Sequence, residues 1–120
     1  PIFDGLNKKA KIQRARLDLE KARNQREELV RGISLEVANA QTNFRNASSR
    51  LNSQQKNLDL AERIYETAQV KYREGVASSL DVTQTQNQYL GTERDFLSAV
   101  LNLLNAKSRL DKVLGNYNNL

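Results

Sequence analysis

The chain has 120 residues, of which 38% are hydrophobic and 28% charged, and its formal net charge is +5. It contains no Cys and no His, which excludes a disulfide framework, a thiolate metal site and the commonest general base. With three Phe, four Tyr and no Trp, the sequence suits long helices that each bury one stripe better than a globular core. No apolar run approaches the roughly 20 residues that a membrane-spanning helix requires.

The basic excess is concentrated in residues 7–16, "NKKAKIQRAR". A nucleic-acid partner requires aromatic or base-reading groups near such a cluster, and a basic hairpin that binds RNA would bind in a salt-sensitive way. Because those groups are missing, we expect no nucleic-acid partner. The sequence also has no phosphate-binding glycine loop and no metal-ligand grouping, so we expect neither an enzyme nor a cofactor.

Residues 1–5, "PIFDG", combine strand-forming residues with an Asp-Gly turn signal. The pattern predicts an extended segment that ends in a turn. Because the first residue is Pro rather than Met, we expect the chain to be a piece of a longer protein.

A long helix is predicted over residues 6–74, where one stripe of residues recurs at alternating steps of four and three. From Ala40 onward, the stripe contains one set of small side chains and one set of large side chains. Each set repeats every seven residues, which favours close helix packing. The stripe is Ala15, Leu19, Ala22, Arg26, Leu29, Ile33, Val37, Ala40, Phe44, Ala47, Leu51, Gln54, Leu58, Ala61, Tyr65, Ala68 and Tyr72. A second, weaker stripe predicts more than one neighbouring helix. It contains Ile12, Leu17, Val30, Leu35, Leu60 and Ile64.

A return helix is predicted over residues 80–115, followed by a polar tail at 116–120. Its expected seam is Val82, Gln86, Tyr89, Glu93, Phe96, Val100, Leu103, Leu110 and Leu114. The sequence therefore predicts an all-α fold, a long antiparallel helical hairpin of coiled-coil type with unequal arms. Because the second arm is about half as long as the first, the N-terminal half of the first helix requires another partner.

The two helices are predicted to be joined by a short turn at residues 75–79. Gly75 provides the left-handed residue that ends the first helix, and Ser78 or Ser79 can cap the second. Asp81 then lies in a first turn, where the helix dipole favours a negative charge. These residues make a turn, but they do not explain why apolar residues flank it at Val76 and Leu80.

The chain resembles one repeat of the TolC-type outer-membrane efflux channels, over nearly its whole length. The most specific part is Tyr72-x-x-Gly75 followed by Asp81-Val82, and "PIFDG" resembles the opening of the C-terminal repeat. The resemblance implies part of an α-barrel tunnel in the periplasmic portion of an outer-membrane protein. In the intact protein it implies a homotrimer that contacts the membrane only through a β-barrel. Residues 1–5 would then be the remnant of a barrel strand.

The resemblance also implies a gate and a docking surface at the turn, which would be the periplasmic tip of an exit duct. The partners would be a periplasmic adaptor and the inner-membrane pump of a tripartite export system. The implied gate residues are Tyr72, Asp81 and Gln84. The implied adaptor-binding residues are Gly75, Val76, Ala77, Ser78, Ser79 and Leu80.

The chain departs from the family pattern at two positions. Ala77 stands where an arginine partner of the closed state can occur, and Gln84 stands where an additional acidic residue can contribute to a cation-binding ring. The resemblance therefore implies closure by hydrogen bonds rather than by an ionic latch. The alternatives are the helical hairpin of a periplasmic adaptor, which predicts arms of equal length, and a structural coiled coil, which predicts a single stripe and no apolar tip.

Overall fold

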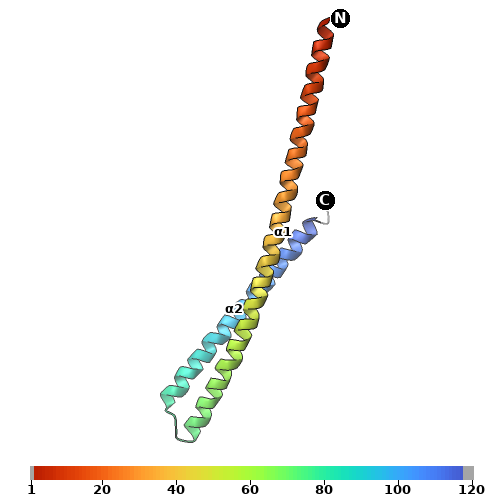
Figure 1. The fold of residues 1–120 in the computed structure, drawn as a ribbon. Coiled ribbons are helices and arrows are strands. Elements are labelled where there is room, and N and C mark those ends of the chain that lie inside the picture. The colour runs from red at the N-terminus through yellow and green to blue at the C-terminus, as the bar shows by residue number, and fades with distance from the viewer. Residues whose placement is uncertain (1, 118–120) are drawn as a thin grey trace. The chain divides into compact units, whose positions relative to one another are not determined.

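The structure is a computed structural model that describes residues 2–117, without the side chains of residues 2–4, 6, 116 and 117. Helix α1 spans Ile2–Arg73 and helix α2 spans Ser79–Tyr117 (Figure 1). The part of the chain that the structure describes contains no strand. The prediction of an all-α fold built from two helices of unequal length is confirmed.

The element boundaries differ from the prediction chiefly at the N-terminus. Residues 2–5 were expected to be extended, but they belong to α1. A strand needs a neighbouring strand for its backbone hydrogen bonds, which the described residues do not provide, whereas a helix satisfies these groups locally. The turn occupies residues 74–78, and α2 includes residues 116 and 117 of the predicted tail. Residues 1 and 118–120 lie outside the described residues.

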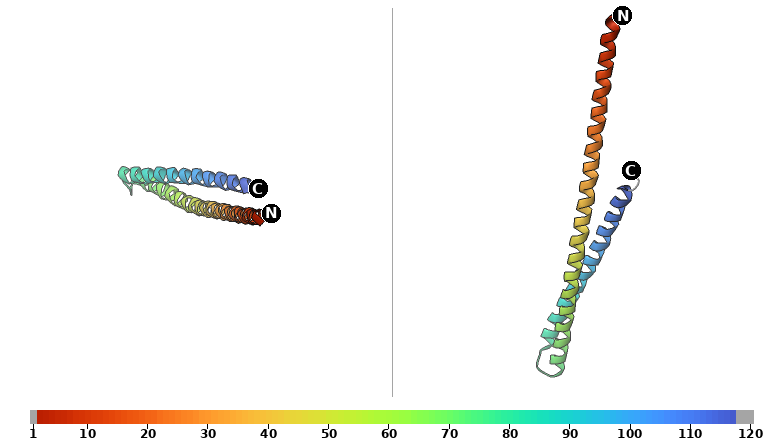
Figure 2. Two further views of the ribbon diagram at one scale, coloured as in Figure 1. Left: turned by 90° about the horizontal axis from the view of Figure 1, so that it is seen from above. Right: turned by 45° about the vertical axis from the view of Figure 1, so that its right-hand side comes forward.

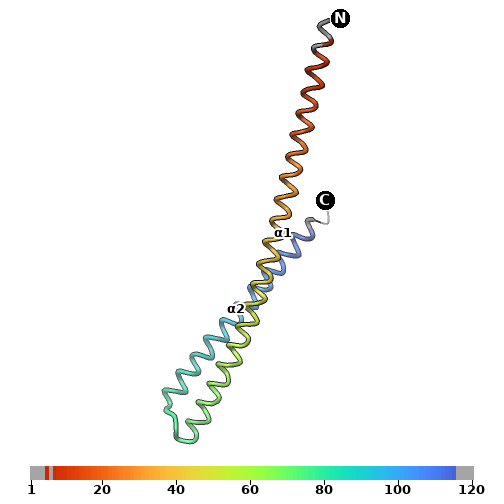
Figure 3. The backbone as a smooth tube through the Cα atoms, viewed as in Figure 1, coloured from red at the N-terminus to blue at the C-terminus, as the bar shows by residue number. Residues whose placement is uncertain are grey.

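The chain divides into two units, residues 1–38 and residues 39–120, which we call the N-terminal stretch and the hairpin. In the hairpin, the second half of α1 and the whole of α2 run in opposite directions and are joined by the turn (Figure 2). The backbone trace shows how tightly the chain reverses between the two helices (Figure 3).

The part of α1 in the hairpin buries the stripe that the sequence predicts. From Ala40 to Ala68, each seam residue is buried or half-buried and the residues between them are exposed. The small seam residues Ala40, Ala61 and Ala68 are the most buried. Gln54 is the polar member of the seam, and its side-chain oxygen accepts a hydrogen bond from Asn57 at 3.3 Å. A strict seven-residue repeat therefore specifies the inner face of this helix.

The seam of α2 differs from the prediction at its small positions. The predicted members Gln86 and Leu114 are exposed and the predicted members Glu93 and Val100 are half-buried, whereas Ala99 and Val113 are buried. The observed seam also repeats every seven residues and alternates large with small side chains. It consists of Val82, Thr85, Tyr89, Thr92, Phe96, Ala99, Leu103, Ala106, Leu110 and Val113. The small members give a weak hydrophobic signal. The residues predicted in their place follow them by one position in the sequence and therefore lie at the side of the seam.

The two seams meet in an aromatic contact between the helices. Tyr65 of α1 stacks on Tyr89 of α2, with ring centroids 5.9 Å apart and an angle of 13° between the ring planes. Stacked aromatic pairs of this kind contribute about 0.5–1.5 kcal/mol beyond the burial of their area. Because Ala61 and Ala68 flank Tyr65 on the seam, the tyrosine pair fits between small neighbours.

The N-terminal stretch has the same kind of sequence pattern, but most of it is exposed. Every residue from 7 to 32 is exposed, including the stripe members Leu19 and Leu29. Ile33 and Val37 are half-buried. Since α1 has 72 residues and α2 has 39, an antiparallel α2 is too short to cover the whole stripe of α1.

Candidate functional site

The end of α1 at the turn is closed by a Schellman motif. The amide of Val76 donates to the carbonyl oxygen of Lys71 at 2.8 Å, and the amide of Gly75 donates to that of Tyr72 at 3.0 Å. These are the two bonds that define the motif, and they satisfy carbonyl groups that a helix end otherwise leaves unpaired. The amide of Ala77 also donates to Lys71, at 3.2 Å.

Gly75 has the backbone conformation that this motif requires. Its φ is 76°, and no other described residue has a positive φ. A Cβ added to Gly75 would meet nothing within 4 Å, so space does not restrict the residue type. The restriction comes from the backbone, because a left-handed conformation costs an L-residue other than Gly about 1–2 kcal/mol.

The start of α2 is held by a reciprocal capping box between Ser78 and Asp81. The Asp81 amide donates to Ser78 Oγ at 3.2 Å, while the Ser78 amide donates to Asp81 Oδ2 at 2.9 Å. The Ser78 hydroxyl donates to the same carboxylate oxygen at 2.8 Å. Of the two serines that the sequence offers, Ser78 is therefore the cap, and Asp81 occupies the third helical position of the box.

The capping box lowers the pKa of Asp81 below its ordinary value of 3.8. The larger cause is the hydrogen bond from the Ser78 amide, followed by the bond from the Ser78 side chain. Both bonds favour the charged form of the carboxyl group. Asp81 therefore stays ionised at neutral pH, and one of its two oxygens is committed to the turn.

The turn exposes apolar side chains although its backbone is fixed at both ends. Val76 is 76% exposed and Leu80 is 63% exposed. Ala77 is half-buried, while Ser78 and Ser79 are exposed. The structure thus brings all six predicted docking residues together at one end of the hairpin. Such an arrangement presents a small apolar surface that a partner can cover.

The three predicted gate residues lie on the two sides of the turn. Tyr72 is in the last turn of α1 and is 51% exposed, Asp81 is in the first turn of α2, and Gln84 is exposed one turn later. Among the described residues, the structure shows no hydrogen bond that joins any two of them. Asp81 bonds to Ser78 instead.

A groove beside the turn, which we call the tip groove, is the part of the site that sequence reasoning missed. Its volume is about 590 Å³, and it lies along one edge of the hairpin. Its lining consists of Arg63, Ile64, Thr67, Ala68, Lys71, Val76, Ala77, Asp81 and Thr85. The spacing of Ile64, Thr67 and Lys71, which follow the seam at steps of three and four, is the signal that could have indicated it.

Residues 5 and 7–115, whose side chains the structure describes, contain no group of three or more His, Cys, Asp and Glu residues that could hold a metal ion. No described helix is long and apolar enough to cross a membrane.

A family model described as "Outer membrane efflux protein" matches residues 1–116 of the chain. No curated protein and no solved structure matches it.

Proposed function

The chain belongs to the outer membrane efflux protein family, and on this premise we propose that its turn is the periplasmic tip of an export channel. Proteins of this family are trimeric transport channels that work with adaptors and pumps, and they are not enzymes. The chain is therefore a component of an outer-membrane efflux channel. We propose that the hairpin forms part of the periplasmic tunnel.

Docking of a periplasmic adaptor is the first role that we propose for the tip. The observation that carries it is the exposure of Val76 and Leu80 on a turn whose two ends are fixed by hydrogen bonds. A surface that is already ordered loses little conformational entropy when a partner binds. Gly75, Ala77, Ser78 and Ser79 supply the backbone that holds the two apolar side chains outward.

Gating is the second role that we propose for the tip. Tyr72, Asp81 and Gln84 stand next to the turn, where neighbouring hairpins of a channel would converge. The Asp81 carboxylate has one oxygen bonded to Ser78, which leaves the other oxygen for a donor on a neighbouring hairpin. Since Ala77 and Gln84 are uncharged, closure rests on hydrogen bonds, and an adaptor that binds the open tip better shifts the equilibrium toward opening.

The docking role is tested by changing Val76 and Leu80 to Glu together in the channel that contains this chain. Placing two carboxylates in an apolar contact costs enough to reduce adaptor binding more than about tenfold, which corresponds to about 1.4 kcal/mol. Co-purification of the adaptor and export of a dye substrate measure the effect. The matched control replaces Val76 with Ile and Leu80 with Met. If the Glu pair leaves adaptor recovery unchanged, the tip is not the docking surface.

The gating role is tested by single-channel conductance in planar bilayers. Replacing Asp81 with Asn, or Tyr72 with Phe, removes a polar contact of the closed state and is expected to raise the open probability. Asp59→Asn makes the same chemical change four turns or more from the tip and is the control. Equal open probabilities in all variants would remove these residues from the gate.

A further inference from the structure

The positive charge of the chain is concentrated in residues 8–16 of α1, which we call the basic segment. Its five basic residues are Lys8, Lys9, Lys11, Arg14 and Arg16. No acidic residue lies between Asp4 and Asp18, whereas residues 17–120 contain 14 basic and 13 acidic residues and are nearly balanced. The net charge of +5 therefore lies almost entirely in the first 16 residues.

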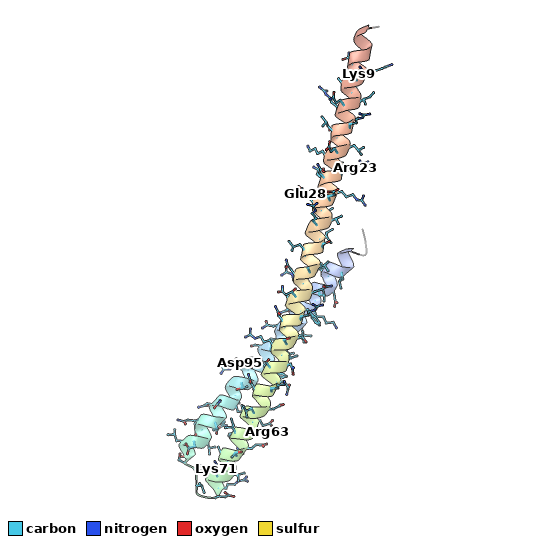
Figure 4. The ribbon with its side chains drawn as sticks, in the orientation of Figure 1. Lys9, Arg23, Glu28, Arg63, Lys71 and Asp95 are labelled. Carbon is cyan, nitrogen blue, oxygen red and sulfur yellow. The ribbon has the colours of Figure 1, made fainter. Side chains whose placement is uncertain are left out.

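The charges of the basic segment are not neutralised by the rest of the described chain. All five side chains are exposed, and Figure 4 labels Lys9 among them. Among the residues whose side chains the structure describes, none forms an ion pair with the basic segment. Lys11 has Lys8 and Arg14 three positions away on either side, and like charges at such spacings disfavour a helix. Helix stability therefore does not account for this segment.

The remainder of the N-terminal stretch carries a different charge pattern. Residues 17–38 contain four basic and five acidic residues. Arg31 Nη2 lies 3.8 Å from Glu27 Oε2, one helical turn along α1. Mixed charges of this kind are typical of a solvated helix surface. The basic segment lacks the acidic partners that such a surface has.

The arrangement of the five charges favours an extended negative surface as the partner. At about 100° per residue, the side chains are spread over more than half of the circumference of the helix. They occupy about 12 Å along its axis. A compact anion contacts one side of a helix only, whereas a layer of lipid headgroups presents phosphates to several sides. Long Lys and Arg side chains can also reach phosphates above and below their own level.

The uncharged residues of this region exclude two other kinds of contact. No aromatic residue lies between Phe3 and Phe44, so the region offers no ring on which nucleic-acid bases could stack. Ile12 is the only large apolar residue of the basic segment, which is too little to insert the helix into hydrocarbon. The segment therefore suits the charged surface of a membrane rather than its interior.

We propose that the basic segment binds the surface of an anionic phospholipid bilayer through the phosphate headgroups. Membership of an outer-membrane family supports a membrane as the partner, and the proposal does not depend on docking or gating at the tip. The resemblance to the efflux channels does not imply this contact. Each basic residue near an anionic surface strengthens binding about fivefold, which corresponds to about 1 kcal/mol. Because the contact is electrostatic, added salt weakens it.

Sedimentation with lipid vesicles tests the proposal on the 120-residue chain. The chain is expected to sediment with vesicles of equal parts phosphatidylglycerol and phosphatidylcholine, and to stay in solution with phosphatidylcholine alone. Replacing Lys8, Lys9 and Arg14 together with Gln is expected to lower the partition coefficient about a hundredfold, since three charges are lost. An unchanged partition coefficient, or no binding of the native chain, would overturn the proposal.

The matched control removes the same three charges from α2. Lys107, Arg109 and Lys112 are exposed, and replacing them with Gln leaves the chain with the same net charge as the first variant. This control is expected to keep its partition coefficient within about twofold, because charges far from the contact are screened. Equal losses in the two variants would show that net charge, and not the basic segment, drives binding. Circular dichroism verifies that both variants are helical.

A tryptophan probe locates the contact without removing any charge. The chain has no native Trp, so a single introduced Trp reports only on its own position. Gln13→Trp is expected to shift its emission to the blue on phosphatidylglycerol vesicles and to be quenched by brominated lipid. Ser108→Trp, at an exposed position of α2, is expected to do neither. The same response from both positions would contradict a contact at the basic segment.

A comparison of salts distinguishes a lipid surface from a site for free phosphate. Sodium phosphate and sodium chloride are expected to release the chain from vesicles equally when their ionic strengths are equal, because screening is the common cause. Much stronger release by phosphate would indicate a discrete phosphate site and would overturn the proposal. Vesicle binding requires no adaptor, so it can succeed in a chain whose tip does not dock one.

Discussion

The N-terminal stretch and the hairpin contain the same kind of stripe, but the stripe is exposed over residues 7–32 and is buried or half-buried from Ala40 to Ala68 of the hairpin. In the hairpin, small seam residues such as Ala61 and Ala99 are almost inaccessible to solvent, at 4% and 1% exposed. In the N-terminal stretch, Ala15, Leu19 and Ala22 occupy equivalent positions and are all exposed. A repeating stripe therefore shows where a helix can be contacted, and a second helix is needed before the stripe contributes to stability.

The comparison predicts that equal substitutions have unequal effects in the two regions. Leu58 is a half-buried seam residue of the hairpin, and Leu19 is an exposed stripe residue of the N-terminal stretch. Leu58→Ala is expected to lower the free energy of unfolding by about 2–3 kcal/mol, because it removes packed methyl groups and leaves a void. Leu19→Ala is expected to change it by less than about 0.5 kcal/mol. Urea unfolding followed by circular dichroism measures both, and equal losses would contradict the comparison.

Enlarging a small residue tests the seam in the opposite direction. Ala99→Leu adds three carbon atoms at a position that is 1% exposed, so it is expected to cost about 2 kcal/mol through overpacking. Ala22→Leu makes the same change at an exposed position and is expected to be neutral within about 0.5 kcal/mol. A neutral result for Ala99→Leu in thermal unfolding would show that the two helices do not approach closely at this layer.

Two glycines provide a third contrast, because replacing each with Ala is expected to change the stability in opposite directions. Gly75→Ala places a side chain on a backbone with φ of 76° and is expected to destabilise the hairpin by about 1 kcal/mol. Gly32→Ala lies inside a helix, where an added Cβ meets nothing within 4 Å, and is expected to stabilise by about 0.5–1 kcal/mol. Melting temperatures of the two variants measure the difference, and a shift in the same direction for both would contradict it.

The smallest expected effect is a pH dependence confined to the turn. The pKa of Asp81 is lower in the folded state than its ordinary value of 3.8, so its bonds to Ser78 stabilise the hairpin fully above that value. This contribution is lost as the pH falls through the lowered pKa of the folded state. Asp81→Asn is therefore expected to reduce the melting temperature at neutral pH. In strong acid, the difference in melting temperature between this variant and the native chain is expected to become smaller.

Asp18→Asn is the control for the pH dependence, because Asp18 is an exposed residue of the N-terminal stretch. A constant difference between Asp81→Asn and the native chain across the acid range would show that the carboxylate does not support the turn.

The amino-acid sequence specifies the two helices, the position of the turn and the inner face of α1. The steps of three and four from Ala40 to Ala68 and the glycine at position 75 are local signals, and the structure agrees with both. The α2 seam was predicted less well, because Thr85, Ala99 and Ala106 are too small to mark a hydrophobic repeat by themselves. The expected extended segment at residues 2–5 was wrong, because strand propensity has no effect without a strand to pair with.

The helical repeat and the residue types of the turn follow from the amino-acid sequence, since both depend on residues within a few positions of each other. Three features became visible only in the folded chain: which serine caps α2, which small residues of α2 are buried and where the tip groove lies. The buried residues of α2 and the position of the groove depend on how the second helix is placed against the first, whereas the choice of serine depends on the backbone that the turn adopts. Arg63 and Lys71 are ordinary residues of a charged helix surface until α2 and the turn enclose one edge of the hairpin and make them the walls of a groove.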